Sequence, residues 1–305
     1  MNGVINVYKE AGFTSHDVVA KLRGIVKQKK IGHTGTLDPD AEGVLPVCLG
    51  NATKLCGLLT EKEKTYRAVL LLGQTTDTQD TSGRVLTEVP VTATGEQVRE
   101  AIMSFLGDYD QVPPMYSALK VNGKKLYELA REGKEVERQA RRVRILDMEI
   151  HEIRLPEVTF TVTCSSGTYI RTLCQDIGEK LGCGGCMKSL LRTKVDRFEL
   201  ADSHKLSELE TMMHEGRIEE VLLPVDDVFA ACPAVRIRQE SDRLIQNGNP
   251  FGREDIAETT GECPPEGTEL ERNCVRVYNS EGDFRGLYRR EQGGRRYKPE
   301  KMFLS

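Results

Sequence analysis

The apolar positions of the chain follow spacings that predict strands and helices in alternation. Residues 4–8 form a short strand candidate that Gly12 ends. A helix is expected next, because Thr14 and Ser15 are typical N-cap residues and the apolar residues behind them recur at helical spacing. These apolar residues are Val18, Val19, Leu22, Ile25 and Val26.

The next part of the chain predicts buried strands between loops. Residues 44–47 indicate a short buried strand, and residues 51–59 indicate a short helix. Residues 64–73 are almost continuously apolar, which predicts a strand that is buried on both faces. Residues 74–83 are rich in turn formers and are expected to form a loop.

Two more helices and a hairpin are predicted further along. Thr94 and Gln97 stand at capping-box spacing before one helix. Residues 143–153 and 157–164 alternate in polarity, which predicts a β-hairpin. A second helix opens at Gly167-Thr168 and ends at Gly182. The apolar faces comprise Val98, Ile102, Phe105 and Leu106 in the first helix, and Ile170, Leu173, Ile177 and Leu181 in the second.

The C-terminal part has a different texture. A short helix is expected at residues 203–214, and residues 222–226 begin a linker. From about Phe229 onward, short β-like runs alternate with Gly, Pro and Asn turns, which suggests a small barrel. The clearest runs are Ala234–Arg238, Cys274–Tyr278 and Phe284–Tyr288.

Composition describes a globular protein. The 305 residues are 38% hydrophobic and 30% charged, enough for one large domain and a small one. No apolar run approaches a membrane span, and residues 1–8 lack the pattern of a signal peptide, so we expect a cytoplasmic protein without membrane contact. The nine cysteines are odd in number, and Cys48, Cys56 and Cys174 lie in apolar stretches, which predicts reduced core thiols.

Charge gives a mixed indication about nucleic acid. The net charge of −4 argues mildly against binding it, but phosphate contacts depend on local patches. Residues 120–144 and 285–301 are both rich in lysine and arginine. For a single patch of this kind, a solvated face of mixed charge is the more common explanation.

The stretch Gly32–Val47 carries the strongest candidate chemistry. It contains three glycines and two prolines, so it is not a regular helix. It presents Asp38 from a constrained loop ahead of a core strand, which suits a catalytic carboxylate. A polar loop with an Asx turn explains the same pattern without catalysis.

This stretch closely resembles the catalytic loop of the TruB family, the tRNA pseudouridine-55 synthases, whose single essential aspartate falls on Asp38. Further family motifs follow in the family's order, and so many motifs in one order do not arise by chance. They are Lys64–Ala68, the loop of Asp77 and Asp80, Gln111–Lys120 and Gly167–Leu173.

The resemblance implies roles for other side chains. Tyr66 would stack on the target base, Leu190 would pack beneath it, and Arg171 would pair with Asp38 and keep it ionised. Asp80 would shape the site through a basic partner. A role for the Asp77/Asp80 loop in metal binding is not expected, because EF-hand ligands do not follow. His33 would contact the RNA loop.

An RNA-clamping arm is implied at about residues 111–144. The basic residues expected to meet the RNA backbone there are Lys120, Lys124, Lys125, Arg131, Arg141 and Arg142. The fold implied is a mixed α+β core around a largely antiparallel sheet at residues 1–226, followed at 229–305 by a PUA-like RNA-binding barrel.

The implied reaction converts uridine 55 in the TΨC loop of tRNA to pseudouridine in a monomeric enzyme. Because the isomerisation changes no atoms overall, no cofactor is expected. The residues leave open whether Asp38 attacks the sugar, attacks the base or removes a sugar proton.

The sequence departs from the family pattern in places. Glu10-Ala11 follows Lys9 where a proline is usual, Leu191 replaces an arginine, and Asp196 falls where glycine is common. Cys183 and Cys186 form a CxxC, but no paired ligands follow at zinc spacing, so zinc is not expected.

Two other functional classes fit parts of the pattern. A non-catalytic tRNA-binding or tRNA-folding protein would need only the arm and the C-terminal domain. A magnesium-dependent phosphohydrolase could use Asp38 and Asp40 as a pair, but its long apolar strand before the first aspartate is missing. Within the main hypothesis, the lack of a basic extension before Val4 favours a stand-alone enzyme over a guide-RNA-dependent one.

Overall fold

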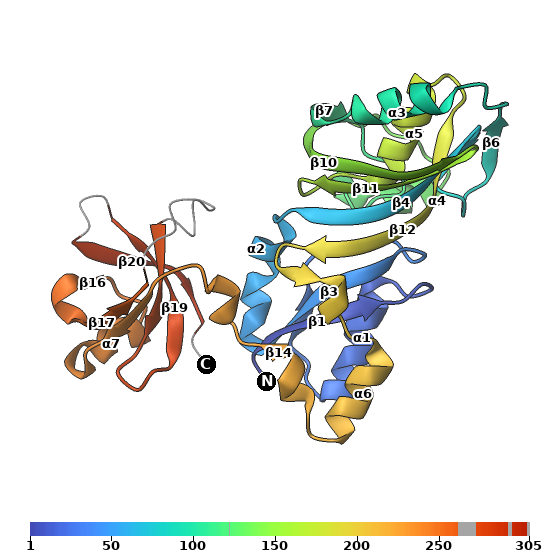
Figure 1. Cartoon of the computed structure of the whole chain (residues 1–305). Helices are drawn as coiled ribbons and strands as arrows, with labels where there is room; N and C mark the ends of the chain where they lie inside the picture. The colour runs from blue at the N-terminus through green and yellow to red at the C-terminus, as the bar shows by residue number, and fades with distance from the viewer. Residues whose placement is uncertain (122, 262–272, 292–294, 304–305) are drawn as a thin grey trace.

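The computed structural model describes residues 1–121, 123–261, 273–291 and 295–303. A large sheet runs through the first part of the chain, and a smaller sheet forms the C-terminal part (Figure 1). Neighbouring strands of the large sheet are antiparallel, except that β12 pairs with β3 in parallel. The strand order is β14 (Leu222–Leu223), β1 (Gly3–Lys9), β3 (Glu42–Leu49), β12 (Gly185–Val195), β4 (Lys64–Leu72), β11 (Glu157–Cys164), β10 (Arg141–Arg154) and β7 (Gly107–Gln111).

Two pairs of helices cover the two ends of this sheet (Figure 1). The helices α1 (Ser15–Val26) and α6 (Leu206–His214) pack against β1 and β3, whereas α3 (Gly95–Met103) and α5 (Ile170–Lys180) pack against β4, β11 and β10. The predicted N-caps are confirmed: Thr14 caps α1 in a capping box with Asp17, and Thr94 caps α3 in a box with Gln97. The hairpin of β10 and β11 is also confirmed.

Some expectations for these elements were wrong. Alternate residues of β4 are buried, while those between them are half-buried or exposed, because the helices cover one face of the sheet here. Leu106 lies beyond the end of α3 and is exposed. Residues 74–83 begin as a strand, since β5 (Gln74–Thr76) pairs with β6 (Val85–Glu88). Residues 222–226 do not begin as a free linker, because β14 joins the sheet edge.

The arm contains little regular structure. The chain after β7 is irregular through the paired prolines, because proline lacks the N–H that regular structure needs. The remaining elements before β10 are β8 (Lys120–Val121), β9 (Lys124–Lys125) and the short helix α4 (Leu126–Arg131). Short pieces elsewhere in the first part are β2 (Ile31–His33), β13 (Phe198–Glu199) and, after a 3-10 turn at Gly50–Leu55, α2 (Cys56–Thr60).

The smaller sheet curls on itself beside the first part (Figure 1). Its strand order is β16 (Phe251–Gly252), β20 (Arg296–Met302), β19 (Phe284–Arg290), β18 (Cys274–Tyr278), β15 (Ala234–Ile237) and β17 (Ile256–Thr260), and α7 (Asp242–Gln246) lies beside it. None of the helices among the described residues has the length and apolar character that a membrane crossing requires.

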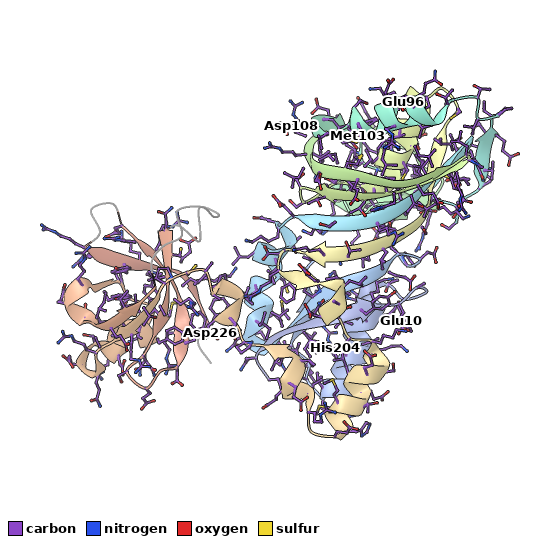
Figure 2. The ribbon with its side chains drawn as sticks, viewed as in Figure 1. Glu10, Glu96, Met103, Asp108, His204 and Asp226 are labelled. Carbon is purple, nitrogen blue, oxygen red and sulfur yellow. The ribbon has the colours of Figure 1, made fainter. Side chains whose placement is uncertain are left out.

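The two parts share a hydrophobic cluster. Phe229, Leu287 and Phe303 of the C-terminal part belong to the same buried cluster as Leu55 and Leu59 of the first part. Polar contacts reinforce this junction. The Lys54 Nζ donates to the Met302 carbonyl at 2.8 Å, and Tyr278 Oη donates to Asp226 Oδ2 at 2.8 Å. Figure 2 shows Asp226 where the chain passes from one part to the other.

Candidate active site

Asp38 and Arg171 form a two-point ion pair. The Arg171 Nε lies 2.9 Å from Asp38 Oδ2, and the Arg171 Nη2 donates to Asp38 Oδ1 at 3.2 Å. Arg171 stands in the first turn of α5 and its side chain is 6% exposed, whereas the Asp38 side chain is 38% exposed. The carboxylate is therefore oriented from one side and accessible from the other.

The same guanidinium binds two further segments. Arg171 Nη1 donates to the Thr78 carbonyl at 2.9 Å, and Arg171 Nη2 donates to the Tyr116 carbonyl at 2.8 Å. Arg171 thus joins the Asp38 loop, the loop between β5 and β6, and the arm. Arg171 is buried at the point where these segments meet.

Asp80 lies beside this pair. Its Oδ2 is 3.6 Å from Arg171 Nη1. Its Oδ1 accepts hydrogen bonds from the Thr78 and Ser82 hydroxyls and from the Ser82 main-chain N–H. Asp77 instead accepts from the Arg84 main-chain N–H. The basic partner expected for Asp80 is therefore Arg171, and both aspartates bind protein donors.

Two side chains hold the main chain on either side of Asp38. The Leu37 N–H donates to Ser15 Oγ at 2.9 Å, and Ser15 Oγ donates to the Leu37 carbonyl at 3.3 Å. The Lys9 Nζ donates to the Pro39 carbonyl at 2.9 Å and to the Ala41 carbonyl at 2.5 Å. Both side chains are buried, so the loop is fixed from within the protein.

Arg192 holds the two ends of the same loop. Its Nε donates to the Val44 carbonyl at 2.7 Å, while Nη2 and Nη1 donate to the carbonyls of Gly35 and Thr36 at 3.4 and 3.5 Å. Gly35 and Thr36 precede Asp38, and Val44 follows it. Polar side chains from β1, α1 and β12 thus hold the loop that carries Asp38.

Electrostatics at the site is dominated by burial. Burial raises the pKa of the Asp38 carboxyl above its ordinary value, Arg171 and Lys9 oppose that rise, and Asp80 adds to it. Burial also lowers the pKa of Lys9 to about 8. The site therefore combines a carboxyl that is unusually easy to protonate with an amine that is unusually easy to deprotonate.

Tyr66 and Leu190 lie close to the Asp38 loop. Tyr66 belongs to a hydrophobic cluster that includes Leu37, and Leu190 packs against that cluster from the neighbouring strand, opposite Ala68. The Tyr66 side chain is buried, and burial raises its pKa. The structure thus places Tyr66 in the same cluster as Leu37, the residue that precedes Asp38, and packs Leu190 against that cluster.

His33 lies at the entrance of the loop. It ends β2 opposite Val47, and its Nδ1 accepts a hydrogen bond from the Gly35 N–H at 3.3 Å. Its ring centroid lies 6.3 Å from that of the exposed His16 on α1. Burial, with the charges of His16 and Arg192, lowers the pKa of His33.

The basic residues of the arm fall into two groups. Lys120, Lys124 and Arg131 are exposed on the short elements of the arm, and Lys125 there is half-buried. Arg141 and Arg142 are exposed at the start of β10, where Arg142 pairs with Asp110 at 3.1 Å. The arm is linked to Asp38 through the Tyr116 main-chain carbonyl, which accepts a hydrogen bond from Arg171.

The sequence reasoning missed the residues that support the loop. Ser15 was expected to act only as part of a helix cap, but Thr14 caps the helix and Ser15 binds Leu37. No role was assigned to Lys9 or Arg192, although both stand within family motifs. No local signal in the sequence marks them, because Lys9 and Arg192 bind main-chain carbonyls that only the fold brings near.

The departures from the family pattern are accommodated locally. Glu10 lies 3.6 Å from Lys205 in an ion pair. Asp196 adopts a φ of +52°, a left-handed conformation that favours glycine and that aspartate tolerates. Leu191 is half-buried on β12 opposite Arg67. Cys183 and Cys186 are both buried free thiols.

Sequence comparisons identify close relatives over the whole chain. A family model described as "TruB family pseudouridylate synthase (N terminal domain)" matches residues 23–170, and one described as "tRNA pseudouridylate synthase B C-terminal domain" matches residues 171–230. A protein of Lachnoclostridium phytofermentans named tRNA pseudouridine synthase B is 53% identical over 100% of both chains. One of the same name from Alkaliphilus oremlandii is 45% identical over 97% of this chain and 96% of its own.

Solved structures share the fold. A chain from the crystal structure of a Cbf5-Nop10-Gar1 complex matches 99% of this chain with a TM-score of 0.72 at 26% identity, covering 85% of its own length. A chain from an H/ACA RNP bound to a substrate RNA gives the same TM-score and coverage at 24% identity. Together with the curled C-terminal sheet, this structural likeness confirms the expected fold, a mixed α+β core followed by a PUA-like C-terminal part.

Proposed function

Because the chain belongs to the TruB family of pseudouridine synthases, we propose that it isomerises uridine 55 in the TΨC loop of tRNA, with Asp38 as the catalytic carboxylate. Pseudouridine synthases are isomerases, so the chain is an enzyme of that class. The relatives named tRNA pseudouridine synthase B support tRNA as the substrate. The choice of uridine 55 rests on the family motifs around Asp38.

The observation that carries the proposal is the Asp38–Arg171 pair. Two contacts from a buried guanidinium fix the direction of the carboxylate, while part of the carboxylate stays accessible to a nucleotide. A preoriented anion needs little reorganisation when positive charge develops at the sugar as the glycosidic bond breaks. A tRNA-folding protein would not require such an arrangement.

The reaction breaks the bond between C1′ and N1 of uridine and forms one between C1′ and C5, and the C5 proton moves to nitrogen. Atoms and electrons balance without any co-reactant. The uracil must detach, turn and reattach while the protein holds it, which requires a site closed to water. A carboxylate beside an apolar surface is sufficient protein chemistry for this sequence of steps.

The neighbouring side chains suit the other tasks. We assign Tyr66 to stacking on the flipped uracil and Leu190 to packing beneath it, since Tyr66 shares a hydrophobic cluster with Leu37 and Leu190 packs against that cluster. Asp80 would hold the Arg171 guanidinium from its far side. His33, half-buried at the loop entrance, would contact the RNA loop.

The remaining parts of the proposal concern RNA binding and context. The exposed lysines and arginines of the arm would contact phosphates of the TΨC stem-loop. We further propose that residues 1–226 form the catalytic domain, that residues 229–305 form an RNA-binding domain, and that the enzyme acts as a cytoplasmic monomer.

The test uses an unmodified tRNA transcript, purified protein and EDTA. Pseudouridine is mapped by carbodiimide treatment and primer extension for the wild type, for Asp38→Asn and, as a matched control, for the loop neighbour Asp40→Asn. We expect a stop at position 55 with the wild type and the control, and none with Asp38→Asn. Tight binding without a stop would favour the tRNA-folding protein, and a stop elsewhere would refute the choice of uridine 55.

A further inference from the structure

Arg192 is a buried charge without an acidic partner. Arg192 is 1% exposed and has the largest fully buried side chain in the described part of the protein. Among the described residues, no carboxylate oxygen lies within 4.0 Å of its guanidinium. Burying an unpaired cation costs free energy, and an apolar side chain of similar volume would fill the space at lower cost. Stability alone therefore does not explain an arginine here.

The contacts of Arg192 join two parts of the site. Its three hydrogen bonds to carbonyls close the Asp38 loop, with Gly35 and Thr36 on one side and Val44 on the other. Across the pairing of β12 with β4 it stands opposite Tyr66, and its charge opposes the rise in the pKa of the Tyr66 hydroxyl. One residue therefore binds the loop that carries the carboxylate and is the cross-strand neighbour of the tyrosine proposed to stack on the base.

The sheet places Arg192 between these partners. In β12 it stands opposite Gly43 in the parallel pairing with β3 and opposite Tyr66 in the antiparallel pairing with β4. A Cβ on Gly43, whose φ is +106°, would lie 2.2 Å from the Arg192 carbonyl oxygen. The close approach of β3 and β12 thus depends on glycine, and it allows the Arg192 side chain to reach the loop from behind.

We propose that Arg192 is a positioning residue that sets the Asp38 carboxylate at a fixed distance from the Tyr66 ring. The inference rests on the proposed function, in which Tyr66 stacks on the uracil and Asp38 acts at its glycosidic bond. The base and the sugar carbon must then be held in one geometry, and Arg192 contacts both of the elements that define it. Arg192 is too deeply buried to touch the RNA, so it acts through these partners.

The test compares full-length Arg192→Met and Arg192→Lys with Lys194→Met, an exposed position on the same strand. We expect Arg192→Met to lower the single-turnover rate at saturating tRNA transcript by about 100-fold, because a small displacement of reacting groups costs that much. The Kd for tRNA should change by less than about threefold, since no RNA contact is lost. Arg192→Lys should recover about tenfold of the rate by restoring one charged donor.

A second readout separates positioning from simple packing. The charge of Arg192 contributes to the lowered pKa of His33, so an NMR titration should show that pKa rise in Arg192→Met and hold in Arg192→Lys. If Arg192→Met does not fold, Arg192→Lys carries the test, with an expected tenfold loss of rate at unchanged Kd. A wild-type rate in either folded variant, or a loss confined to Kd, would overturn the proposal.

Failure of the proposed function would look different. In that case the wild type would produce no pseudouridine, or Asp38→Asn would keep full activity, whatever the Arg192 variants do. A slow Arg192→Met beside an active wild type and an inactive Asp38→Asn supports both proposals.

Discussion

Arg171 donates a hydrogen bond to the Tyr116 carbonyl, 2.8 Å away, through the same Nη2 atom that binds Asp38. The arm and the candidate catalytic carboxylate are therefore attached to one side chain. Tyr116 lies in the irregular segment after the paired prolines, so the first part of the arm is attached through Arg171 to the Asp38 loop. A change in the position of the arm would alter the contacts of the group that orients Asp38.

Arg171→Lys should show what the two-point contact contributes. Lysine keeps the charge but cannot bind both carboxylate oxygens and two carbonyls in one plane. We expect the single-turnover rate to fall by about 100-fold while tRNA binding changes little. Arg217→Lys, at an exposed arginine with its own carboxylate partners, is the matched control and should match the wild type. A rate loss explained by weaker tRNA binding would contradict this role.

The pH dependence of the rate should report Asp38. Because its pKa is raised, we expect activity to be lost on the acid side at a pH above the usual range of an aspartate. The negative charge of Asp80 adds to that rise, so Asp80→Asn should lower the pKa and move the acid limb to lower pH. Single-turnover rates measured over a range of about pH 4.5 to pH 8 test both statements. Movement of the limb to higher pH in Asp80→Asn would refute the assignment.

Lys9 should make stability depend on pH in a particular window. Its pKa is about 8 in the folded state and 10.5 as the ordinary value, so between these values the unfolded chain binds more protons. The free energy of unfolding of the wild type, relative to Lys9→Met, should therefore rise with pH from 8 to 10.5, by about 3 kcal/mol in total.

Urea unfolding of the wild type and Lys9→Met at about pH 7, 8.5 and 10, on both sides of the folded pKa, measures the difference in their free energies of unfolding. Below pH 8 the lysine is charged in both states, so the difference should be constant there. Lys29→Met, at an exposed lysine, should show no such window. A difference between wild type and Lys9→Met that stays constant up to pH 10 would exclude a buried, easily deprotonated Lys9.

The arm predicts a salt-dependent contribution to tRNA binding. If Lys124 and Lys125 each meet a phosphate, the double substitution to alanine should reduce the slope of log K against log salt by about 2. Arg142→Ala should have a smaller effect, because Asp108 and Asp110 already lie near its guanidinium. Filter binding at several salt concentrations distinguishes these cases. An unchanged slope in the lysine double variant would remove the arm from the RNA interface.

Local signals in the sequence predicted local structure well. The caps at Thr14 and Thr94 were found because each is a short pattern read within a few residues. The strand β12 was missed because register shifts on both sides of Leu190 interrupt its alternation of apolar and polar residues. The two-sided burial of β4 was wrong because an apolar run does not reveal which face lacks a covering helix.

For the site residues, too, some could be predicted from the sequence and others could not. The resemblance led to Asp38 and Arg171, which the fold brings together across 133 positions of sequence. Lys9, Ser15 and Arg192 were missed because they bind main-chain carbonyls and amides, and such contacts leave no complementary residue in the sequence. Their function becomes visible only when the folded loop places those carbonyls around them.

The shared hydrophobic cluster at the junction has a consequence for how this chain can be divided. Leu55 and Leu59 share their buried cluster with residues beyond 226, namely Phe229, Leu287 and Phe303. A fragment ending near residue 226 would therefore expose an apolar surface that is buried in the intact protein. The C-terminal part is therefore not a detachable module that a truncation or gene rearrangement could remove cleanly. The stability of the first sheet is therefore tied to the presence of the second.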